Sequence, residues 1–384
     1  MKIAFVLIPE KGHVNPYIGP AQHLRDGGHD VVIAAPGDIS QQVTRAGLTF
    51  HSALIRQHGG GRVTHGRELV ELIQDPARLD VWIEELLLGG VDGDVPLIRN
   101  WLAQERADAV VIDPLYYAAA IAAHQACLPW ASVSNSLNPV LRPETGSALL
   151  HTTRRLDPAR RVLFQSHGLD PRFSGCDVLS PFLNVAFTTE EFTGPAPADV
   201  NLVGPSIPRD ARGDEVEILP VHTRHLVYAS FGSQIYHWPE LFARIHQACR
   251  RLGAWLAISA GSLGIGADWE DCHVYRYAPQ MRLLRNAHAF ITHGGANSVM
   301  EAIACGVPML VSPMCNDQFH QAWFVERAGI GRVDDLRHAS ADRIAEHLGF
   351  LLSDAGLQQR LAPITKSYQR DGAREAARLI TEMR

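Results

Sequence analysis

The sequence has 384 residues, of which 46% are hydrophobic and 20% are charged, with 32 glycines and 23 prolines. This length exceeds what one hydrophobic core usually supports, so we expect two domains, and the composition excludes disordered and fibrous proteins. The 35 basic and 41 acidic side chains give a net charge of −6. A negatively charged chain does not attract a polyanion, so nucleic acid is not expected as a partner.

The cysteines and the apolar runs indicate where the protein resides. No two cysteines form a C-x-x-C pair, so their spacing fits neither a zinc site nor a disulfide framework. Reduced thiols are typical of the cytoplasm, where we expect this protein. The apolar run at 3–8 is too short for the core of a signal peptide. No stretch of about 18 apolar residues predicts an integral membrane segment.

Short apolar runs alternate with helix-length amphipathic segments through the first half of the chain. This alternation is typical of an α/β fold, in which crossover helices cover a parallel sheet. The stretch 58–94 is polar and irregular, but Trp82 and Leu86 to Leu88 fall on helical segments. These apolar side chains either line a pocket or pack locally. The predicted strands of this half are 3–8, 30–34, 48–51 and 109–112.

A second series of strands follows a polar stretch that contains several prolines. It predicts strands over 226–231, 255–259, 273–275, 289–292 and 308–312, and a final helix over 373–383. We therefore predict two similar open α/β domains, at 1–205 and 223–362, joined by a linker at 206–222 and followed by a helical tail at 363–384. Open parallel sheets bind ligands beyond the carboxyl ends of their strands, so the loops there are the expected site.

A histidine and an aspartate follow two strands of the first domain. The first strand leads into Gly12-His13-Val14-Asn15-Pro16, and Pro16 suits the first turn of a helix, so we expect His13 on the preceding loop. Asp113 comes directly after the fourth strand. In the strand order 3-2-1-4, strands one and four are neighbours, so His13 and Asp113 can meet. An aspartate that binds one imidazole N–H prepares the other nitrogen to accept a proton. The alternatives are a histidine bonded to the backbone and an Asp-Pro turn.

The second domain carries a glycine-rich turn between a strand and a helix. The strand at 289–292 runs into residues 293–298, with the sequence HGGANS, and the helix ends near Gly306. Glycines let backbone amides approach a ligand closely, and a helix N-terminus favours an anion, so we predict a phosphate site. Asn297 and Ser298 either bind that phosphate or cap the helix, and Glu301 shares the face of Asn297. By the same strand-order argument, Ser233 lies beside this turn.

Two further polar side chains follow the strand at 308–312. Asp317 and Gln318 offer a carboxylate and an amide at the same edge of the sheet. This pair suits the neighbouring hydroxyls of a sugar, although either residue alone is an ordinary loop residue.

The segment 275–318 resembles the donor-binding signature of the family 1 glycosyltransferases, which include the UDP-glycosyltransferases. The matching parts are 275–284, 291–301 and 306–308, followed by Asp317 and Gln318, and their order and spacing fit the signature. Residues 12–16 and 230–233 match other marks of the family, whereas 52–106 and 135–185 match none. The sequence thus resembles the bacterial members that act on natural products and other small molecules.

The resemblance implies a GT-B architecture, in which two Rossmann-like domains face each other across a cleft. The acceptor would bind the first domain and the nucleotide sugar mainly the second. By the family pattern, His13 is the general base and Asp113 its partner. The implied donor ligands are His293, Gly295, Asn297, Ser298 and Ser233 for the diphosphate, Tyr277, Gln280 and Glu301 for the nucleoside, and Asp317 and Gln318 for the sugar.

Three positions bear on the choice of donor. Tyr277 and Ala296 stand where many plant members carry tryptophan, which affects selectivity for the base. Thr292 precedes His293, where many antibiotic-decorating enzymes that use dTDP-sugars have a second histidine. A UDP-sugar is therefore favoured, with a dTDP-sugar as the other possibility.

No metal and no cofactor are expected besides this co-substrate. Charge-assisted hydrogen bonds contribute about 1.5–3 kcal/mol each, and a helix terminus about 0.3–2 kcal/mol. Several such contacts suffice to stabilise a departing diphosphate. Asp92-Gly93-Asp94 resembles the D-x-D metal motif of the other glycosyltransferase fold, but it lacks the context of that fold and is predicted to be a turn.

The sequence thus predicts an inverting hexosyltransferase of secondary metabolism, including antibiotic biosynthesis. It would move a sugar from a nucleotide sugar to a hydroxyl of a small lipophilic or aromatic acceptor and form a β-glycoside, as a monomer or homodimer. One alternative is a nucleotide-sugar epimerase of similar fold, which needs no acceptor. Another is a catalytically silent nucleotide-binding helper, although the presence of both His13 and Asp113 argues against it.

Overall fold

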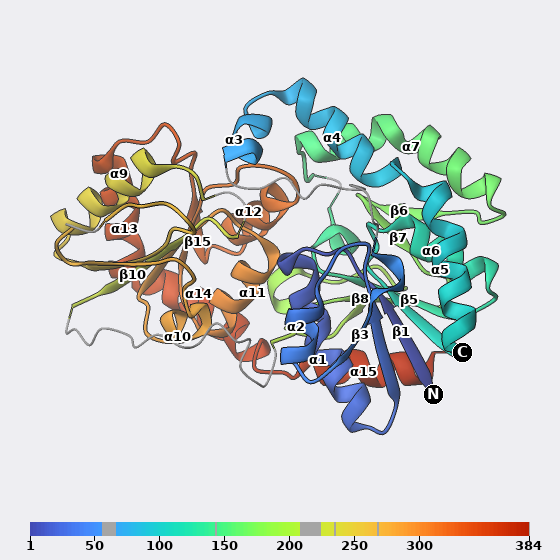
Figure 1. Cartoon of the computed structure of the whole chain (residues 1–384). Helices are drawn as coiled ribbons and strands as arrows, with labels where there is room; N and C mark the ends of the chain where they lie inside the picture. The colour runs from blue at the N-terminus through green and yellow to red at the C-terminus, as the bar shows by residue number, and fades with distance from the viewer. Residues whose placement is uncertain (56–66, 143, 208–223, 234–235, 267–268, 384) are drawn as a thin grey trace.

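The protein folds into two lobes, each built on one parallel sheet (Figure 1). The computed structural model describes residues 1–55, 67–142, 144–207, 224–233, 236–266 and 269–383. The first lobe comprises the described residues up to 207, and the second lobe those of 224–367. The predicted α/β class is therefore confirmed. Most of the predicted linker, 206–222, lies outside the described residues.

The sheet of the first lobe has the order β3-β2-β1-β4-β5-β8-β9, and all its pairings are parallel. The predicted strands at 30–34 and 109–112 are confirmed as β2 and β4. β5 was not predicted because Ser132 and Ser134 interrupt its apolar run; both are buried, and the Ser132 hydroxyl donates to the backbone oxygen of Val178 at 2.7 Å. The strands are β1 Lys2–Val6, β2 Asp30–Ala34, β3 Thr49–His51, β4 Ala109–Ile112, β5 Trp130–Ser134, β8 Leu183–Ala186 and β9 Asn201–Leu202, and a separate antiparallel hairpin pairs β6 Arg172–Ser174 with β7 Asp177–Leu179.

The sheet of the second lobe repeats this order as β12-β11-β10-β13-β14-β15. Its central strands are buried along their whole length, as expected for a sheet covered on both faces. The short strand β15 was not predicted. The strands are β10 Leu226–Ser230, β11 Trp255–Ser259, β12 Cys272–Tyr275, β13 Ala289–Thr292, β14 Met309–Val311 and β15 Gly331–Val333.

Helices cover both faces of each sheet (Figure 1). In the first lobe they are α1 Lys11–Asp26, α2 Ser40–Arg45, α3 Arg67–Ile73, α4 Pro76–Leu88, α5 Val91–Glu105, α6 Tyr117–Gln125, α7 Ala148–Ser166 and α8 Glu190–Thr193, with 3₁₀ turns at Ser52–Leu54 and Asn138–Val140. In the second lobe they are α9 Pro239–Arg251, α10 Gln280–Leu284, α11 Ala296–Ala304, α12 Gln318–Arg327, α13 Ala341–Ser353 and α14 Ala355–Ser367.

Two local predictions were wrong. His13 lies in the first turn of α1, because that helix begins at Lys11 and not near Pro16. Asp92-Gly93-Asp94 forms the first turn of α5 and not an isolated turn. Gly90 starts this helix in a left-handed conformation with φ 69°, and acidic side chains are stabilised by the positive end of the helix dipole.

The last helix, α15 (Gly372–Glu382), returns to the first lobe and packs against α1 (Figure 1). The predicted start of the tail at residue 363 falls inside α14, so the crossing between the lobes comes after Ser367. Hydrogen bonds between Thr188 and Tyr368 at 3.0 Å and between Thr189 and Ser367 at 2.7 Å also join the first lobe to the end of the second. The chain thus passes between the lobes twice, once between residues 207 and 224 and once after Ser367.

Two expectations about the whole chain can be compared with the structure. All six cysteines, Cys127, Cys176, Cys249, Cys272, Cys305 and Cys315, are free thiols. Among the described residues, none of the helices combines the length and the apolar character that crossing a membrane requires.

Candidate active site

A cleft of about 680 Å³ lies between the carboxyl ends of the two sheets. Both lobes line it, as the crevice rule for open sheets predicts. Asp113 lies behind this surface, bonded to His13. The other eleven predicted site residues line the cleft: His13, Ser233, Tyr277, Gln280, His293, Gly295, Asn297, Ser298, Glu301, Asp317 and Gln318.

The predicted contact between His13 and Asp113 is present. Nδ1 of His13 lies 2.6 Å from Oδ2 of Asp113, which is fully buried. The other carboxylate oxygen accepts the backbone N–H of Leu115 at 3.1 Å, so the carboxylate is held on both sides. His13 is partly exposed and lines the cleft. This arrangement makes Nδ1 the donor to Asp113 and leaves Nε2 as the nitrogen that can accept a proton.

The charges around His13 determine its affinity for a proton. Burial lowers the pKa of His13, but the Asp113 carboxylate, with Glu10 and Asp317, outweighs this effect and raises the pKa to about 9. Burial also raises the pKa of Asp317 to about 6, an effect that nearby His13 opposes. The unliganded site thus favours the imidazolium at neutral pH, and the base becomes available as the pH rises.

His293 follows β13 and sits in a slot made by two glycines. A methyl group on Gly232 would lie 2.8 Å from its Nε2, and one on Gly295 would lie 2.6 Å away. Gly232 also has φ +78°, a backbone conformation that residues other than glycine rarely adopt. Burial lowers the pKa of His293 to about 4, although a bond to the Ser230 backbone opposes the shift. His293 is therefore a neutral hydrogen-bonding group.

The first turn of α11 carries two more of the predicted diphosphate ligands, Asn297 and Ser298. The Asn297 amide donates to the backbone oxygen of Gly12 at 2.9 Å, so it connects the second lobe to the turn that carries His13. Ser298 is buried beneath the cleft surface and its hydroxyl accepts from Gln280 at 3.4 Å. The same Gln280 amide donates to Glu301 at 2.8 Å. Ser298, Gln280 and Glu301 thus form one hydrogen-bonded group at the start of α11.

Tyr277 stands across the cleft from the first lobe. Its ring is 46% exposed, and the Lys11 ammonium lies 3.6 Å above the ring centre and also donates to the Tyr277 hydroxyl. A base that stacks on Tyr277 therefore either displaces Lys11 from this face or uses the opposite one.

The two predicted sugar ligands differ in how free they are. Asp317 borders the cleft at the start of α12. The Gln318 side-chain oxygen, in contrast, accepts the backbone N–H groups of Met314 at 2.9 Å and Cys315 at 3.1 Å. Gln318 is thus already engaged in holding the turn that presents Asp317.

One wall of the cleft is apolar. Of the two alternatives for the stretch 58–94, the pocket holds for its described part, since Trp82, Leu86 and Leu87 from α4 line the cleft. Further aliphatic lining residues of the first lobe are Ile8, Ile83, Leu115 and Leu149. These side chains belong to the first lobe, on the same side as His13.

Sequence reasoning missed two polar residues in contact with the site. No motif in the sequence singled out Lys11, which contacts Tyr277. Asn135, directly after β5, places its side-chain amide 2.8 Å from Nδ1 of His13. The position of Asn135 at the carboxyl end of a strand next to β4 is a signal that could have found it, but β5 itself was not predicted.

Comparisons with known proteins agree with this geometry. Residues 208–361 match the model of the family described as "UDP-glucoronosyl and UDP-glucosyl transferase". NDP-glycosyltransferase YjiC of Bacillus subtilis (strain 168) is 24% identical, over 98% of this chain and 95% of its own.

Two solved structures have the same fold. The glycotransferase of kitacinnamycin superposes with a TM-score of 0.77 at 23% identity, covering 99% of this chain and 98% of its own. Glycosyltransferase VinC, solved in complex with dTDP, superposes with a TM-score of 0.67 at 18% identity over the full length of both chains. The matched proteins are described as glycosyltransferases, which favours the transferase interpretation over the epimerase and over the silent helper.

Proposed function

We propose that this chain is a family 1 glycosyltransferase with the GT-B fold, which carries out inverting transfer of a sugar to a small apolar acceptor. The match of residues 208–361 to the family model and the fold shared with known glycosyltransferases support this proposal. The donor is a nucleotide sugar, with UDP favoured, and the product is a β-glycoside. The observation that carries the proposal is the position of the His13–Asp113 pair, which lies in one cleft with the apolar wall and the start of α11.

In the proposed reaction His13 is the general base. Nε2 accepts the proton of the acceptor hydroxyl while the oxygen attacks the anomeric carbon of the donor. The bond between that carbon and the diphosphate oxygen breaks, and the nucleoside diphosphate leaves with the electron pair. Attack from the face opposite the leaving group converts an α-linked donor into a β-linked product. Asp113 stabilises the imidazolium that forms and keeps Nδ1 protonated.

The second lobe would stabilise the leaving group. The N-terminus of α11 presents backbone N–H groups, and the neutral His293 adds a donor beside them. The Asn297 amide reaches the same place once it exchanges its bond to Gly12 for one to the diphosphate. The proposal routes no step through a metal, so added chelator is expected to leave the rate unchanged.

Two features support the choice of substrates. Trp82, Leu86 and Leu87 offer apolar surface next to His13, which suits a lipophilic or aromatic acceptor. Thr292 stands before His293, which favours a UDP-sugar, whereas the dTDP bound to VinC keeps a dTDP-sugar as the second candidate.

Mass spectrometry of reaction mixtures tests the proposal directly. The purified protein is incubated with UDP-glucose or with a dTDP-sugar, each with and without a panel of phenols and macrolides. We expect a product heavier by one sugar only when an acceptor is present. The control is His13→Ala, which is expected to lose transfer while UDP binding, measured by calorimetry, is retained.

Three outcomes would contradict the proposal. An isomerised sugar nucleotide without acceptor would indicate an epimerase. UDP binding without product from any acceptor would indicate a silent binding protein. Loss of UDP binding in His13→Ala would remove His13 from the role of base.

A further inference from the structure

Nδ1 of His13 has a second neighbour besides Asp113. Nδ2 of the Asn135 amide is placed 2.8 Å from this nitrogen, and Oδ2 of Asp113 lies 2.6 Å from it. Asn135 is partly buried and borders the cleft. The imidazole is therefore held at Nδ1 by two side chains from neighbouring strands, β4 and β5.

The hydrogen on Nδ1 decides which end of the amide faces the ring. A carboxylate at 2.6 Å requires Nδ1 to carry the hydrogen, so an amide N–H directed at the same atom finds no lone pair. The oxygen and nitrogen of an amide occupy equivalent positions after a half turn. With its oxygen toward the ring, Asn135 accepts the same hydrogen as Asp113. The opposite orientation would favour the other tautomer, whose Nε2 carries a hydrogen and cannot act as a base.

The turn that carries Asn135 is fixed from below by a buried carboxylate. Ser134 donates to Oδ2 of Asp177 at 2.5 Å, and Asn138 donates to Oδ1 at 2.7 Å. Asp177 is 1% exposed and belongs to β7. Because both ends of the segment 134–138 are tied to one side chain, Asn135 has little freedom to move away from the imidazole.

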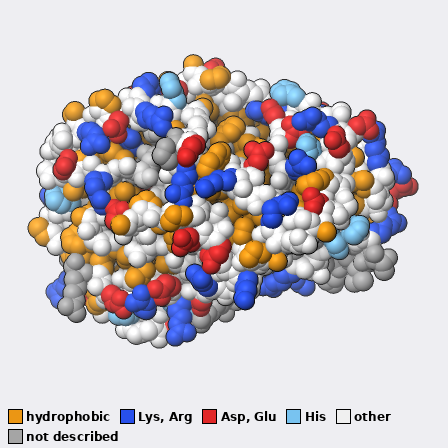
Figure 2. Space-filling model, turned by 180° about the vertical axis from the view of Figure 1, so that it is seen from behind, with side chains coloured by type: hydrophobic (Ala, Val, Ile, Leu, Met, Phe, Trp, Pro, Cys, Tyr) orange, Lys and Arg blue, Asp and Glu red, His pale blue; other side chains and the backbone are white. Residues whose placement is uncertain are grey.

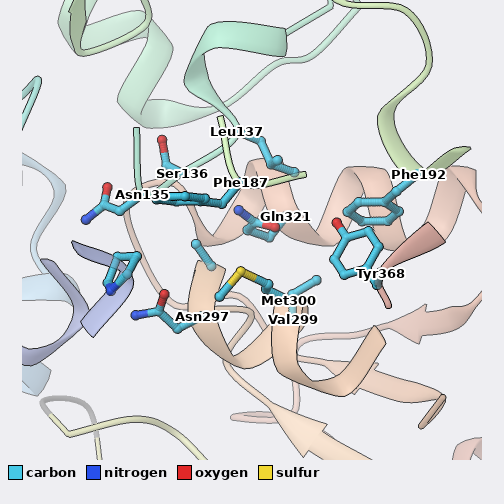
Figure 3. A pocket seen from close by; sticks show the side chains of 12 residues that line it. Asn135, Ser136, Leu137, Phe187, Phe192, Asn297, Val299, Met300, Gln321 and Tyr368 are labelled. Atoms are coloured by element: carbon cyan, nitrogen blue, oxygen red, sulfur yellow. The ribbon is translucent and has the colours of Figure 1, made fainter. Parts of the chain in front are cut away.

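The second lobe adds a further restraint on the same region. Figure 3 shows Asn135 and Asn297 at one end of the small cavity between the lobes, and Phe192 and Tyr368 at the other. This cavity measures about 20 Å³, room for about one water molecule, so the lobes pack closely here. Asn297 binds the backbone of Gly12, next to His13.

We propose that Asn135 is a positioning residue, which fixes the orientation and the tautomer of His13 by accepting the Nδ1 hydrogen together with Asp113. The contribution of Asn135 to catalysis rests on the proposed function, in which His13 is the base. The charged groups that face His13 are Asp113 after β4, Glu10 before α1 and Asp317 before α12. All three are carboxylates that raise the pKa of His13. A change of charge at position 135 would therefore change this pKa further.

Two substitutions of opposite character test the proposal. Asn135→Leu removes the acceptor, so the pKa of His13 is expected to fall. The rate of glycosyl transfer by this variant, measured above the pKa of His13, should drop about 2- to 12-fold, which is the effect of one hydrogen bond. Asn135→Asp keeps the shape and adds a carboxylate, so the pKa of His13 is expected to rise by about one unit or more. Asn201→Asp, on the edge strand β9, adds the same charge away from the site and is the control.

The measurement is an NMR titration of the full-length protein labelled with ¹⁵N-histidine, in which the signal missing from His13→Gln identifies His13. The rate of glycosyl transfer is followed over the same pH range. Opposite shifts of the His13 pKa in the two variants, with no shift in Asn201→Asp, support the proposal. Unchanged values, or shifts in one direction, overturn it and leave Asn135 a structural residue. The titration needs no substrate, so it decides the contact even if no acceptor is glycosylated and the proposed function fails.

Discussion

The two sheets share one strand order, and each lobe places a histidine at the cleft. The pKa of one histidine is raised, however, and the pKa of the other is lowered. In the first lobe the first turn of α1, which follows β1, supplies His13, and the loop after β4 supplies Asp113. In the second lobe the equivalent strands are β10 and β13, which supply Gly232 and His293. One histidine meets a carboxylate, and the other meets a glycine.

This difference explains why one ring suits proton transfer and the other suits binding. Asp113 raises the pKa of His13 to about 9, whereas burial without a carboxylate lowers the pKa of His293 to about 4. Sheet topology therefore fixes where a functional side chain stands, and the neighbouring strand decides its chemistry. Substitutions at the two histidines and at their neighbours test whether the two rings have these different roles.

The largest effect is expected from His13→Gln. General base catalysis contributes about 10²- to 10⁴-fold, so kcat should fall by that factor, because glutamine cannot take up the proton. The donor KM should stay nearly unchanged, since the proposed donor ligands belong to the second lobe. Steady-state kinetics with a fixed acceptor measure both. An equal loss in His293→Gln and His13→Gln would erase the distinction between the two histidines.

Asp113→Asn should come next, with a loss of about 100-fold or more within the range of general base catalysis. Removing the carboxylate lowers the pKa of His13, so the rise of the rate with pH should move to lower pH. A profile that keeps its original midpoint would show that Asp113 does not control His13.

The wild-type pH profile tests the raised pKa itself. The base works only when neutral, so kcat/KM should rise about tenfold per pH unit as His13 loses its proton and level off above about pH 9. The neutral His293 adds no second step in this range. A rate that already levels off near pH 6 would contradict the effect of Asp113.

Gly295→Ala breaks the slot of His293 in the second lobe. Its methyl group would lie 2.6 Å from Nε2, so the ring must move. Loss of a charge-assisted bond of about 1.5–3 kcal/mol corresponds to UDP binding weaker by about 10- to 150-fold. Calorimetry measures this effect. Gly93→Ala in α5, where the added methyl group meets no other atom, is the matched control.

Lys11→Met should have the smallest effect. A cation above an exposed ring contributes about 0.5–1 kcal/mol, so freeing the face of Tyr277 should lower the donor KM by up to about fivefold. Lys366→Met, in α14 and away from the cleft, is the control. A raised donor KM would show instead that Lys11 assists donor binding.

The surface of the molecule carries charged side chains of both signs. Figure 2 shows Lys and Arg interspersed with Asp and Glu over this face of the molecule, as the net charge of −6 with 35 basic residues suggests.

Sequence by itself determined the two parallel sheets and most of the candidate site. Apolar runs flanked by polar loops give β2, β4, β10, β11 and β13 within a residue, because buried parallel strands need continuous apolar side chains. The strand order then follows from topology, which is why His13 and Asp113 could be paired across 100 positions of the chain.

Tertiary structure alone decided which groups modify those residues. Asn135 follows a strand with two serines, whose buried hydroxyls are satisfied by distant partners that sequence does not reveal. The Gln318 side chain accepts a backbone N–H of its own loop, and the Asn297 amide donates to the backbone of the first lobe. Local patterns record burial and helix starts, but hydrogen bonds between segments far apart in the chain, and the pKa shifts they cause, exist only once the chain has folded.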